Sequence, residues 1–403
     1  FDRRFLIFGT DFRISDHKEW GLFERVIVSL DLAKPRHSDD DGTSDSTPFG
    51  MLLAAGMWDL IVFDEAHRLA RDDRGRSTLR YKLAQALRGK TDRLILLTGT
   101  PHQGDTGKFR NLLMLVRPDL NAAIDAIETE PDVVQEIVLR NRKIDAVDLD
   151  GTFLFKGVVV RRAAIDHDPE FEELERQLRA YLRMGYRAGD TLGGAEGRAI
   201  GFVMTIYRKM ASSSIAALYI ALKNRLERLS TQNDAESPSY SLVDDEELEG
   251  DDQLEERSRG PGRSPFFETE TQLLQDLMAK AAEAMRNDKK GDALVSLVCD
   301  IVIAQKKKVL IFTEYRSTQA YLIYRIKSAI GEKPVIINGS MTVEDKRDAV
   351  RAFETENSIL ISTEAGGEGL NLHKDCHILI NYDLPWNPAR ISQRIGRLYR
   401  YGQ

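Results

Sequence analysis

Apolar residues gather in short continuous runs toward both ends of the chain, separated by helical or polar stretches. Continuous apolar runs are typical of parallel strands that are buried on both faces. The sequence therefore predicts an α/β fold with two doubly wound parallel sheets, each covered by helices. The predicted strands are Phe5 to Phe8, Val26 to Leu30, Leu60 to Phe63, Leu94 to Leu97, Val309 to Thr313, Val335 to Asn338, Ile359 to Ser362 and Ile378 to Tyr382.

Between these two regions the apolar residues change to helical spacing, which predicts a helical insertion whose helices pack against one another. In the second α/β region a helix is expected to begin at Thr342, because Asp345 follows three residues later as a variant of the capping box. The helical series in the insertion are Phe171, Leu174, Leu178, Tyr181 and Leu182, followed by Ile215, Leu218, Leu222, Leu226 and Leu229.

From Thr231 to Pro265 the chain is rich in Asp, Glu, Ser, Gly and Pro, and it is most acidic from Asp244 to Glu256. Such a segment buries too little apolar surface to order itself, so we expect a disordered linker, with a DNA-mimicking acidic regulator as the alternative. The predicted organisation is a first lobe over residues 1–120, the helical insertion over 121–230, the linker over 231–267 and a second lobe over 268–403.

The formal net charge of −7 argues against a generally basic nucleic-acid binder. Because much of the acid lies in the linker, any nucleic-acid surface is expected to be a local basic patch. No apolar run approaches the ~20 residues that cross a bilayer, and no secretory signal is evident, so a cytoplasmic location is expected. Cys299 and Cys376 are too few for a disulfide framework or a zinc site, and we expect both to be buried thiols.

The run Asp-Glu-Ala-His at Asp64 to His67 follows directly on a predicted buried strand. Ligands of parallel sheets bind at the carboxyl ends of the strands. Phosphoryl transfer to water requires a magnesium ion and a group that orients the attacking water. Asp64 suits the first role and Glu65 the second, although an isolated match of this kind is equally typical of a solvated acidic turn.

The next predicted strand ends in Thr98-Gly99-Thr100-Pro101. Small hydroxyl groups at that edge can relay the state of a bound nucleotide to a neighbouring lobe. The same tetrapeptide is also ordinary turn chemistry, which is the simpler interpretation when it is taken alone.

Two features near the C-terminal end favour phosphate binding. The predicted loop from Thr363 to Gly369 contains Gly366, Gly367 and Gly369, whose backbone N–H groups can approach phosphate oxygens closely, with Asn371 as a polar neighbour. Further on, Gln393, Gly396, Arg397 and Arg400 follow the spacing Gln-x-x-Gly-Arg-x-x-Arg. Arginines three residues apart share one face of a helical turn and can reach a single polyphosphate, so both are candidate arginine fingers.

Gly89-Lys90-Thr91 resembles the end of a phosphate-binding P-loop. It precedes a predicted strand, however, whereas a P-loop follows one, and Ala84 occupies the place of the first glycine. We therefore reject it, and the 403 residues contain no other Walker A pattern.

Taken in order, these motifs resemble those of the Swi/Snf-type ATPases of helicase superfamily two. Two segments are the most specific to that group, Asp383 to Pro388 and Arg397 to Gln403. The segment from Met210 to Ser214 is similar to the bacterial branch that contains the RNA-polymerase-recycling translocase and the DISARM-type phage-defence helicases.

The resemblance implies two RecA-like lobes that hydrolyse ATP with Mg²⁺ and move along double-stranded DNA, with RNA polymerase or defence-system proteins as further partners. It implies nucleotide contacts from Asp64, His67, Gly367, Gly369, Arg397 and Arg400, with Asp64 as metal ligand and Gln393 in the catalytic set. Nucleic-acid contacts are implied for Thr100, Thr313, Thr363, Gly366 and Asn371.

The family's glycine-rich loop and its lysine lie upstream of the point that corresponds to Phe1, so we expect a fragment of a longer enzyme. A catalytically inert module that grips DNA or polymerase is one alternative. A strand-separating helicase is another, although no aromatic cluster of the kind that holds single strands accompanies the loop motifs.

Overall fold

The computed structural model describes residues 4–36, 47–99, 104–129, 131–155, 157–166, 169–230, 264–367, 372 and 374–400. They belong to two compact units, Phe1–Asn141 and Arg142–Gln403. The helical region expected at residues 121–230 is divided between them, since α5 (Asn121–Asp125) and α6 (Val133–Ile137) belong to the first unit.

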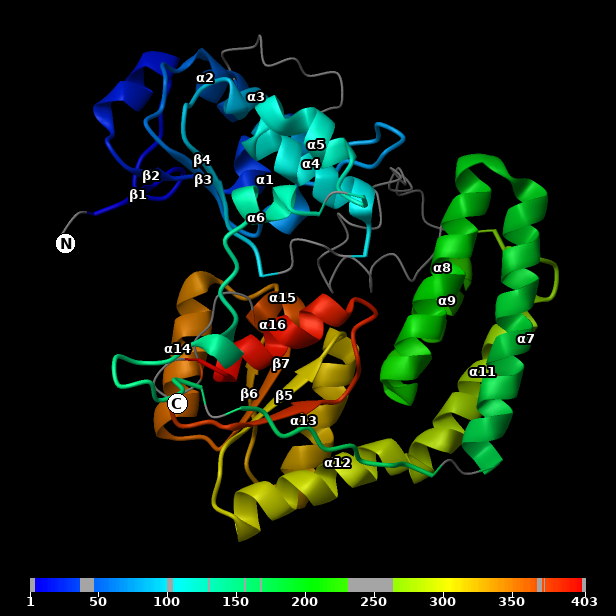
Figure 1. Cartoon of the computed structure of the whole chain (residues 1–403). Helices are drawn as coiled ribbons and strands as arrows, with labels where there is room; N and C mark the ends of the chain where they lie inside the picture. Colours follow the sequence, from blue (N-terminus) through cyan, green and yellow to red (C-terminus); the bar gives the residue numbers. More distant parts are fainter. Residues whose placement is uncertain are drawn as a thin grey trace. The chain divides into compact units, whose positions relative to one another are not determined.

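The second unit contains a four-stranded, wholly parallel sheet in the order β6-β7-β5-β8 (Figure 1). All four strands lie where the apolar runs predicted them. Helices connect them, as parallel strands require. The strands are β5 (Val309–Thr313), β6 (Val335–Ile337), β7 (Ile359–Thr363) and β8 (Ile378–Asn381), and the connecting helices include α13 (Arg316–Ile330) and α14 (Val343–Thr355).

This sheet is covered on both faces, which confirms the doubly wound prediction for the second unit. Val309 and Ile311 point to one face and meet residues of α12 (Lys289–Cys299) and α13. Leu310 and Phe312 point to the other face and meet residues of α14 and α16 (Pro388–Leu398). Because every residue of β5 and β7 is buried, these strands show no alternation of polar and apolar residues.

The helix expected at Thr342 is present as α14. Thr342 accepts a hydrogen bond from the Asp345 N–H, and the Asp345 side chain accepts one from the Thr342 N–H, which completes the capping box. Two orphan donors at the helix start are thereby satisfied, so the helix begins where the sequence predicted.

The expected helical series form α7 (Pro169–Leu192) and α9 (Ile215–Ser230), with α8 (Gly194–Ser213) between them. Together with α11 (Glu270–Ala284) they form a bundle in the second unit (Figure 1). Its core holds a fully buried ion pair in which Arg225 donates to Glu270 at 3.0 Å.

Most of the predicted linker, residues 231–263, lies outside the described residues. Its last part, residues 264–267, joins the bundle instead, because Phe266 and Phe267 pack against the bundle core. Two adjacent aromatic side chains bury enough apolar surface to fix this end of the segment.

The first unit contains two parallel strand pairs, β1 (Leu6–Ile7) with β2 (Val26–Ile27) and β3 (Ile61–Phe63) with β4 (Leu94–Leu96). Its core lies on one side of these strands and includes Trp20, Phe63, Tyr81 and Leu83. The other side is exposed, since Val62 is 47% and Ile95 is 44% accessible. In the described part of this unit only one face of these strands reaches a core.

The remaining elements complete the two units. In the first they are η1 (His17–Leu22), α1 (Leu30–Ala33), α2 (Pro48–Ala54), η2 (Ala66–Arg68), α3 (Leu79–Arg88), α4 (Thr106–Val116) and η3 (Pro118–Leu120). In the second they are η4 (Lys143–Asp145), η5 (Met285–Asn287), η6 (Asp300–Ala304) and α15 (Glu364–Gly367).

Among the described residues, no helix combines the length and apolar character that spanning a membrane requires. Cys376 is buried, as expected, and burial raises the pKa of its thiol to about 11. Cys299 is only partly buried, so that expectation is wrong for it.

Candidate functional site

The carboxyl end of β3 carries the first group of candidate residues. Asp64 and Glu65 are both exposed directly after buried Phe63. Glu65 has the left-handed backbone angles φ 47° and ψ 46°, and its N–H donates to Asp64 Oδ1 at 2.9 Å. A left-handed non-glycine residue costs roughly 1–2 kcal/mol, and such strain clusters at functional sites.

His67 joins this carboxylate pair to the neighbouring strand. Its Nδ1 lies 3.2 Å from Glu65 Oε2 and 3.3 Å from Thr98 Oγ1. The contact is possible because β3 and β4 are parallel neighbours that pair Phe63 with Leu96, so their carboxyl ends coincide. The Asp-Glu-Ala-His run and Thr98 therefore meet at one edge.

The residues at this edge fit a magnesium ion that also binds a phosphate. Mg²⁺ is usually held by one or two carboxylates together with waters and substrate phosphate oxygens. Asp64 supplies an exposed carboxylate of that kind. Among the described residues, no group of three or more His, Cys, Asp or Glu side chains is placed to hold a metal by itself.

In the second unit, the glycine-rich segment begins as a helical turn, α15, where a loop was expected. A Cβ atom on Gly366 would lie 2.5 Å from the Asn338 backbone, and one on Gly367 would lie 2.9 Å from the Phe312 ring. These two glycines therefore allow close packing of α15 against the ends of β6 and β5. Their expected contacts with ligands stay predictions.

Thr313 and Thr363 are fully buried at the ends of β5 and β7. The Thr313 hydroxyl donates to Asp383 Oδ2 at 2.7 Å, and the Thr363 hydroxyl accepts from the Gly366 N–H at 3.4 Å. Both hydroxyls thus have partners inside the protein, and their contacts with nucleic acid stay predictions.

Gln393 and Arg397 lie partly buried on α16, which carries part of the arginine motif. The helix ends at Leu398, so Arg400 lies two residues beyond it. Arg400 Nε donates to the Gly396 carbonyl at 2.8 Å, so its side chain folds back onto the last turn of α16. The two arginines were expected on one face of a helical turn. In the structure Arg397 lies in α16, whereas Arg400 lies just beyond its end.

The end of α16 is also held by Lys143. Its Nζ donates to the Tyr399 carbonyl and lies 4.8 Å from the centre of the Tyr399 ring and 5.4 Å from that of Phe155. Burial, and the positive charge of Arg400, lower the pKa of Lys143.

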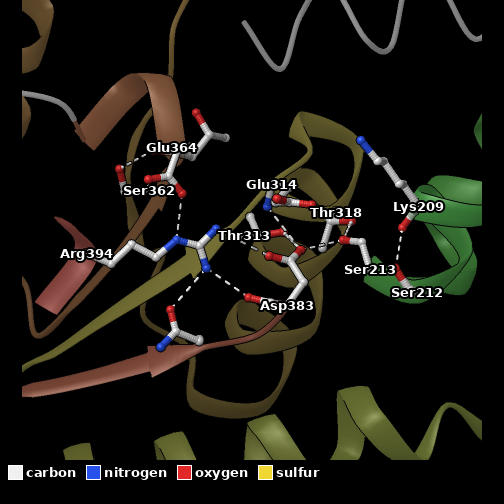
Figure 2. Close-up of polar contacts among 12 residues, drawn as sticks. Lys209, Ser212, Ser213, Thr313, Glu314, Thr318, Ser362, Glu364, Asp383 and Arg394 are labelled. Atoms are coloured by element: carbon white, nitrogen blue, oxygen red, sulfur yellow. Dashed lines mark hydrogen bonds and ion pairs between the residues drawn. The ribbon is translucent and has the colours of Figure 1, made fainter. Parts of the chain in front are cut away.

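Arg394 on α16 is fully buried and makes three hydrogen bonds to neighbouring elements (Figure 2). It donates to Glu364 Oε2 at 2.7 Å, to Asn381 Oδ1 at 3.0 Å and to the Asp383 carbonyl at 2.8 Å. It thereby fixes α16 to the ends of β7 and β8.

Asp383 lies at the centre of a buried polar network just after β8 (Figure 2). Its Oδ2 accepts hydrogen bonds from the hydroxyls of Ser213 and Thr313 and from the Glu314 N–H, at 2.5, 2.7 and 3.0 Å. Burial raises the pKa of Glu314 to about 7, and the charge of Asp383 acts in the same direction.

The sequence did not assign roles to Ser213, Glu314, Glu364, Asp383 or Arg394. One signal was available for Asp383, because it follows an apolar strand just as Asp64 does. Thr100, Gly369 and Asn371, also expected in the site, lie outside the described residues.

Similarity to known proteins agrees with these motifs. Residues 289–402 match the family model described as "Helicase conserved C-terminal domain". The chain is 28% identical over 399 residues to a Bacillus subtilis protein named "Uncharacterized ATP-dependent helicase YqhH", covering 95% of this chain and 58% of that protein. The chain is thus similar to helicase-like proteins of the Swi/Snf type in superfamily two.

Two further relatives carry names with a stated biological context. RNA polymerase-associated protein RapA of Vibrio atlanticus is 24% identical over 358 residues, covering 86% of this chain and 34% of that protein. DNA repair and recombination protein RAD54B of Gallus gallus is 25% identical over 365 residues, covering 86% and 36%. This chain thus spans less than two thirds of the length of each of these relatives.

Proposed function

We propose that this chain belongs to an ATP-dependent translocase that moves along double-stranded DNA. The observation that carries the proposal is the contact of His67 with both Glu65 and Thr98, because it connects a water-orienting carboxylate to the neighbouring strand end. The names of the relatives support it, since they refer to an ATP-dependent helicase and to a DNA repair and recombination protein.

In this proposal Asp64 holds the magnesium ion, which neutralises phosphate charge when bound. Glu65 orients the attacking water, and His67 keeps the Glu65 carboxylate in place. Arg397, together with Arg400, stabilises the charge on the transferring phosphoryl group, a contribution of about 10³ to 10⁵ in rate in related GTPases.

DNA is bound in this proposal through its phosphates, so binding is blind to sequence and weakens with salt. RNA polymerase is a candidate protein partner, because one relative is named as associated with it. Remodelling of polymerase or other protein–DNA complexes, and a role in phage defence, are the biological settings that fit such a motor, and the cytoplasm is the proposed location.

The test is DNA-stimulated ATP hydrolysis by the full-length protein on blunt duplex DNA. We expect Glu65→Gln to lower kcat at least about 100-fold, the usual contribution of a positioned acid–base group. Glu24→Gln is the matched control, since it makes the same change at an exposed carboxylate of the same unit. Retention of full activity by Glu65→Gln contradicts the proposal.

Two other functions make different predictions. An inert binding module, favoured by the lack of a Walker A pattern in these 403 residues, binds duplex DNA without hydrolysing ATP. A strand-separating helicase, favoured by the name of the Bacillus subtilis relative, unwinds forked duplexes. Parallel assays of ATPase activity and of unwinding with forked and blunt duplexes distinguish all three.

A further inference from the structure

The turn between α8 and α9 places two serines inside the second unit. α8 ends at Ser213, Ser214 is extended with φ −154° and ψ 152°, and α9 begins at Ile215. Ser213 is 1% and Ser214 is 3% accessible. The Ser214 hydroxyl accepts a hydrogen bond from the Ala217 N–H at 3.0 Å and so caps α9. The short connection between α8 and α9 is therefore buried and is held by a hydrogen bond of its own.

The Ser213–Ser214 turn is bonded to the α/β part of the same unit. Ser213 Oγ donates to Asp383 Oδ2 at 2.5 Å, and the hydroxyls of both serines lie within 2.9 Å of Thr318 Oγ1 on α13. Lys290 Nζ donates to the carbonyls of Ser212 and Ser213 at 3.0 and 2.6 Å. Figure 2 shows the Ser213 side chain pointing from α8 toward Asp383.

The other carboxylate oxygen of Asp383, Oδ1, faces Arg394 on α16. It lies 3.8 Å from Arg394 Nη2, and neither atom has a hydrogen-bond partner among the described residues. The two groups attract each other at an ion-pair distance without a hydrogen bond. Coulomb attraction is stronger in a buried setting than in water, so a shift of Asp383 changes its attraction for Arg394.

We propose that the Ser213–Ser214 turn, acting through Asp383 and Arg394, sets the position of α16 and hence the presentation of the Arg397 guanidinium. Ser213 and Asp383 are positioning residues in this arrangement, because they act through Arg394 and touch no reacting atom. The consequence for turnover rests on the proposed function. A partner that shifts the helical bundle then changes the ATPase rate without contacting the nucleotide.

The test compares Ser213→Ala with Ser212→Ala in the full-length protein. Ser212 is the matched control, because its exposed hydroxyl donates to the Lys209 carbonyl on the same turn. Loss of a hydrogen bond to a charged group amounts to a factor of about 10 or more. We therefore expect Ser213→Ala to speed amide hydrogen exchange in residues 388–398 about tenfold relative to residues 343–355, and Ser212→Ala to leave it unchanged.

Steady-state ATPase assays on duplex DNA supply a second readout. We expect Ser213→Ala to lower kcat about tenfold with the KM for ATP changed less than about twofold. Ser213→Thr keeps the hydroxyl and should restore the rate. Asp383→Asn should slow turnover as well, and its effect should not add to that of Ser213→Ala, since both break one chain of contacts.

Equal exchange of residues 388–398 in the two serine variants overturns this inference, whatever the ATPase rates. A wild-type protein without DNA-stimulated ATPase activity overturns the proposed function instead, and the exchange rates then still decide the coupling between the turn and α16. Melting temperatures of all variants confirm that folded proteins are being compared.

Discussion

Glu314 is a carboxyl group whose surroundings strongly raise its pKa. It follows β5 directly, and burial is the main reason that its pKa rises from 4.5 to about 7. The carboxylates of Asp383 and Glu364 act in the same direction, whereas the guanidiniums of Arg394 and Arg390 oppose the rise. Near neutral pH the second unit therefore holds a carboxyl group that is close to half protonated.

This raised pKa predicts a loss of stability as pH increases. Between pH 4.5 and 7 the folded state binds the Glu314 proton more tightly than the unfolded state, so its stabilising contribution is full below pH 4.5 and is lost above about pH 7. The contribution is on the order of 3 kcal/mol. Glu314→Gln mimics the neutral form and should flatten this part of the pH profile.

Urea unfolding at a series of pH values from 5 to 8 measures the effect. The expected result is a variant that gains stability over the wild type as the pH rises. Glu344→Gln, the same change at an exposed glutamate of the second unit, is the control. Parallel pH profiles for wild type and Glu314→Gln would show that this carboxyl is not the group responsible.

At this scale the sequence identified part of the candidate site. Asp64 and Glu65 could be found because they follow an apolar run, and their strand end places them at the sheet edge. The role of Asp383 could not, because its partner Ser213 lies 170 residues away. Only the folded chain brings such partners together, and a motif read along the chain contains no information about them.

At the scale of elements, the strands of the second unit were predictable because they are continuous apolar runs, and β5 and β7 are buried on both faces. The start of α14 was predictable because its capping box is local in sequence. The helical turn of α15 was not predictable. Gly366 and Gly367 are required there by close packing against β6 and β5, and the local sequence does not reveal that packing.

The two kinds of glycine in the second unit should respond oppositely to alanine. Gly366→Ala puts a Cβ 2.5 Å from the Asn338 backbone, so it should destabilise the protein by about 1–3 kcal/mol. Gly396→Ala lies within α16, meets nothing within 4 Å, and should stabilise by about 0.5–1 kcal/mol. Urea unfolding of both variants checks the pair, and a neutral Gly366→Ala would contradict the packing described for α15.

The bundle depends on the ion pair between Arg225 and Glu270. Both side chains are fully buried, and Glu270 also accepts hydrogen bonds from the Tyr181 hydroxyl and the Phe266 N–H. Removing one partner of a buried pair leaves an uncompensated charge and costs about 3–5 kcal/mol.

Glu270→Ala should therefore unfold the bundle at markedly lower urea concentration. Glu283→Ala is the control on the same helix, since it removes an exposed pair with Lys280 that contributes less than about 1 kcal/mol. Similar unfolding midpoints for the two variants would mean that the buried pair does not stabilise the bundle.

At the scale of the whole molecule, the proposed motor needs contributions from both units. The first unit carries Asp64, Glu65 and His67, and the second carries Arg397. Sequence order alone could assign these residues to two α/β regions. It could not show that the strands of the first unit leave Val62 and Ile95 exposed, because both runs are apolar throughout.

Separate roles for catalysis and DNA binding predict a split phenotype for Arg397→Ala. Loss of the guanidinium should reduce kcat by about 10³ or more. Affinity for duplex DNA should change less than about twofold, since the proposed function binds DNA through many phosphate contacts. ATPase assays and fluorescence anisotropy at fixed salt measure the two effects, and a parallel loss of DNA affinity would assign Arg397 to DNA binding.

The most direct measurement is an experimental structure of the full-length protein with a non-hydrolysable ATP analogue and Mg²⁺. We expect Asp64 to contact the metal, Glu65 to reach the γ-phosphate through one water, and the Arg397 guanidinium to hydrogen-bond the same γ-phosphate. A bound nucleotide with Arg397 directed elsewhere, on a surface that does not face Glu65, would contradict it.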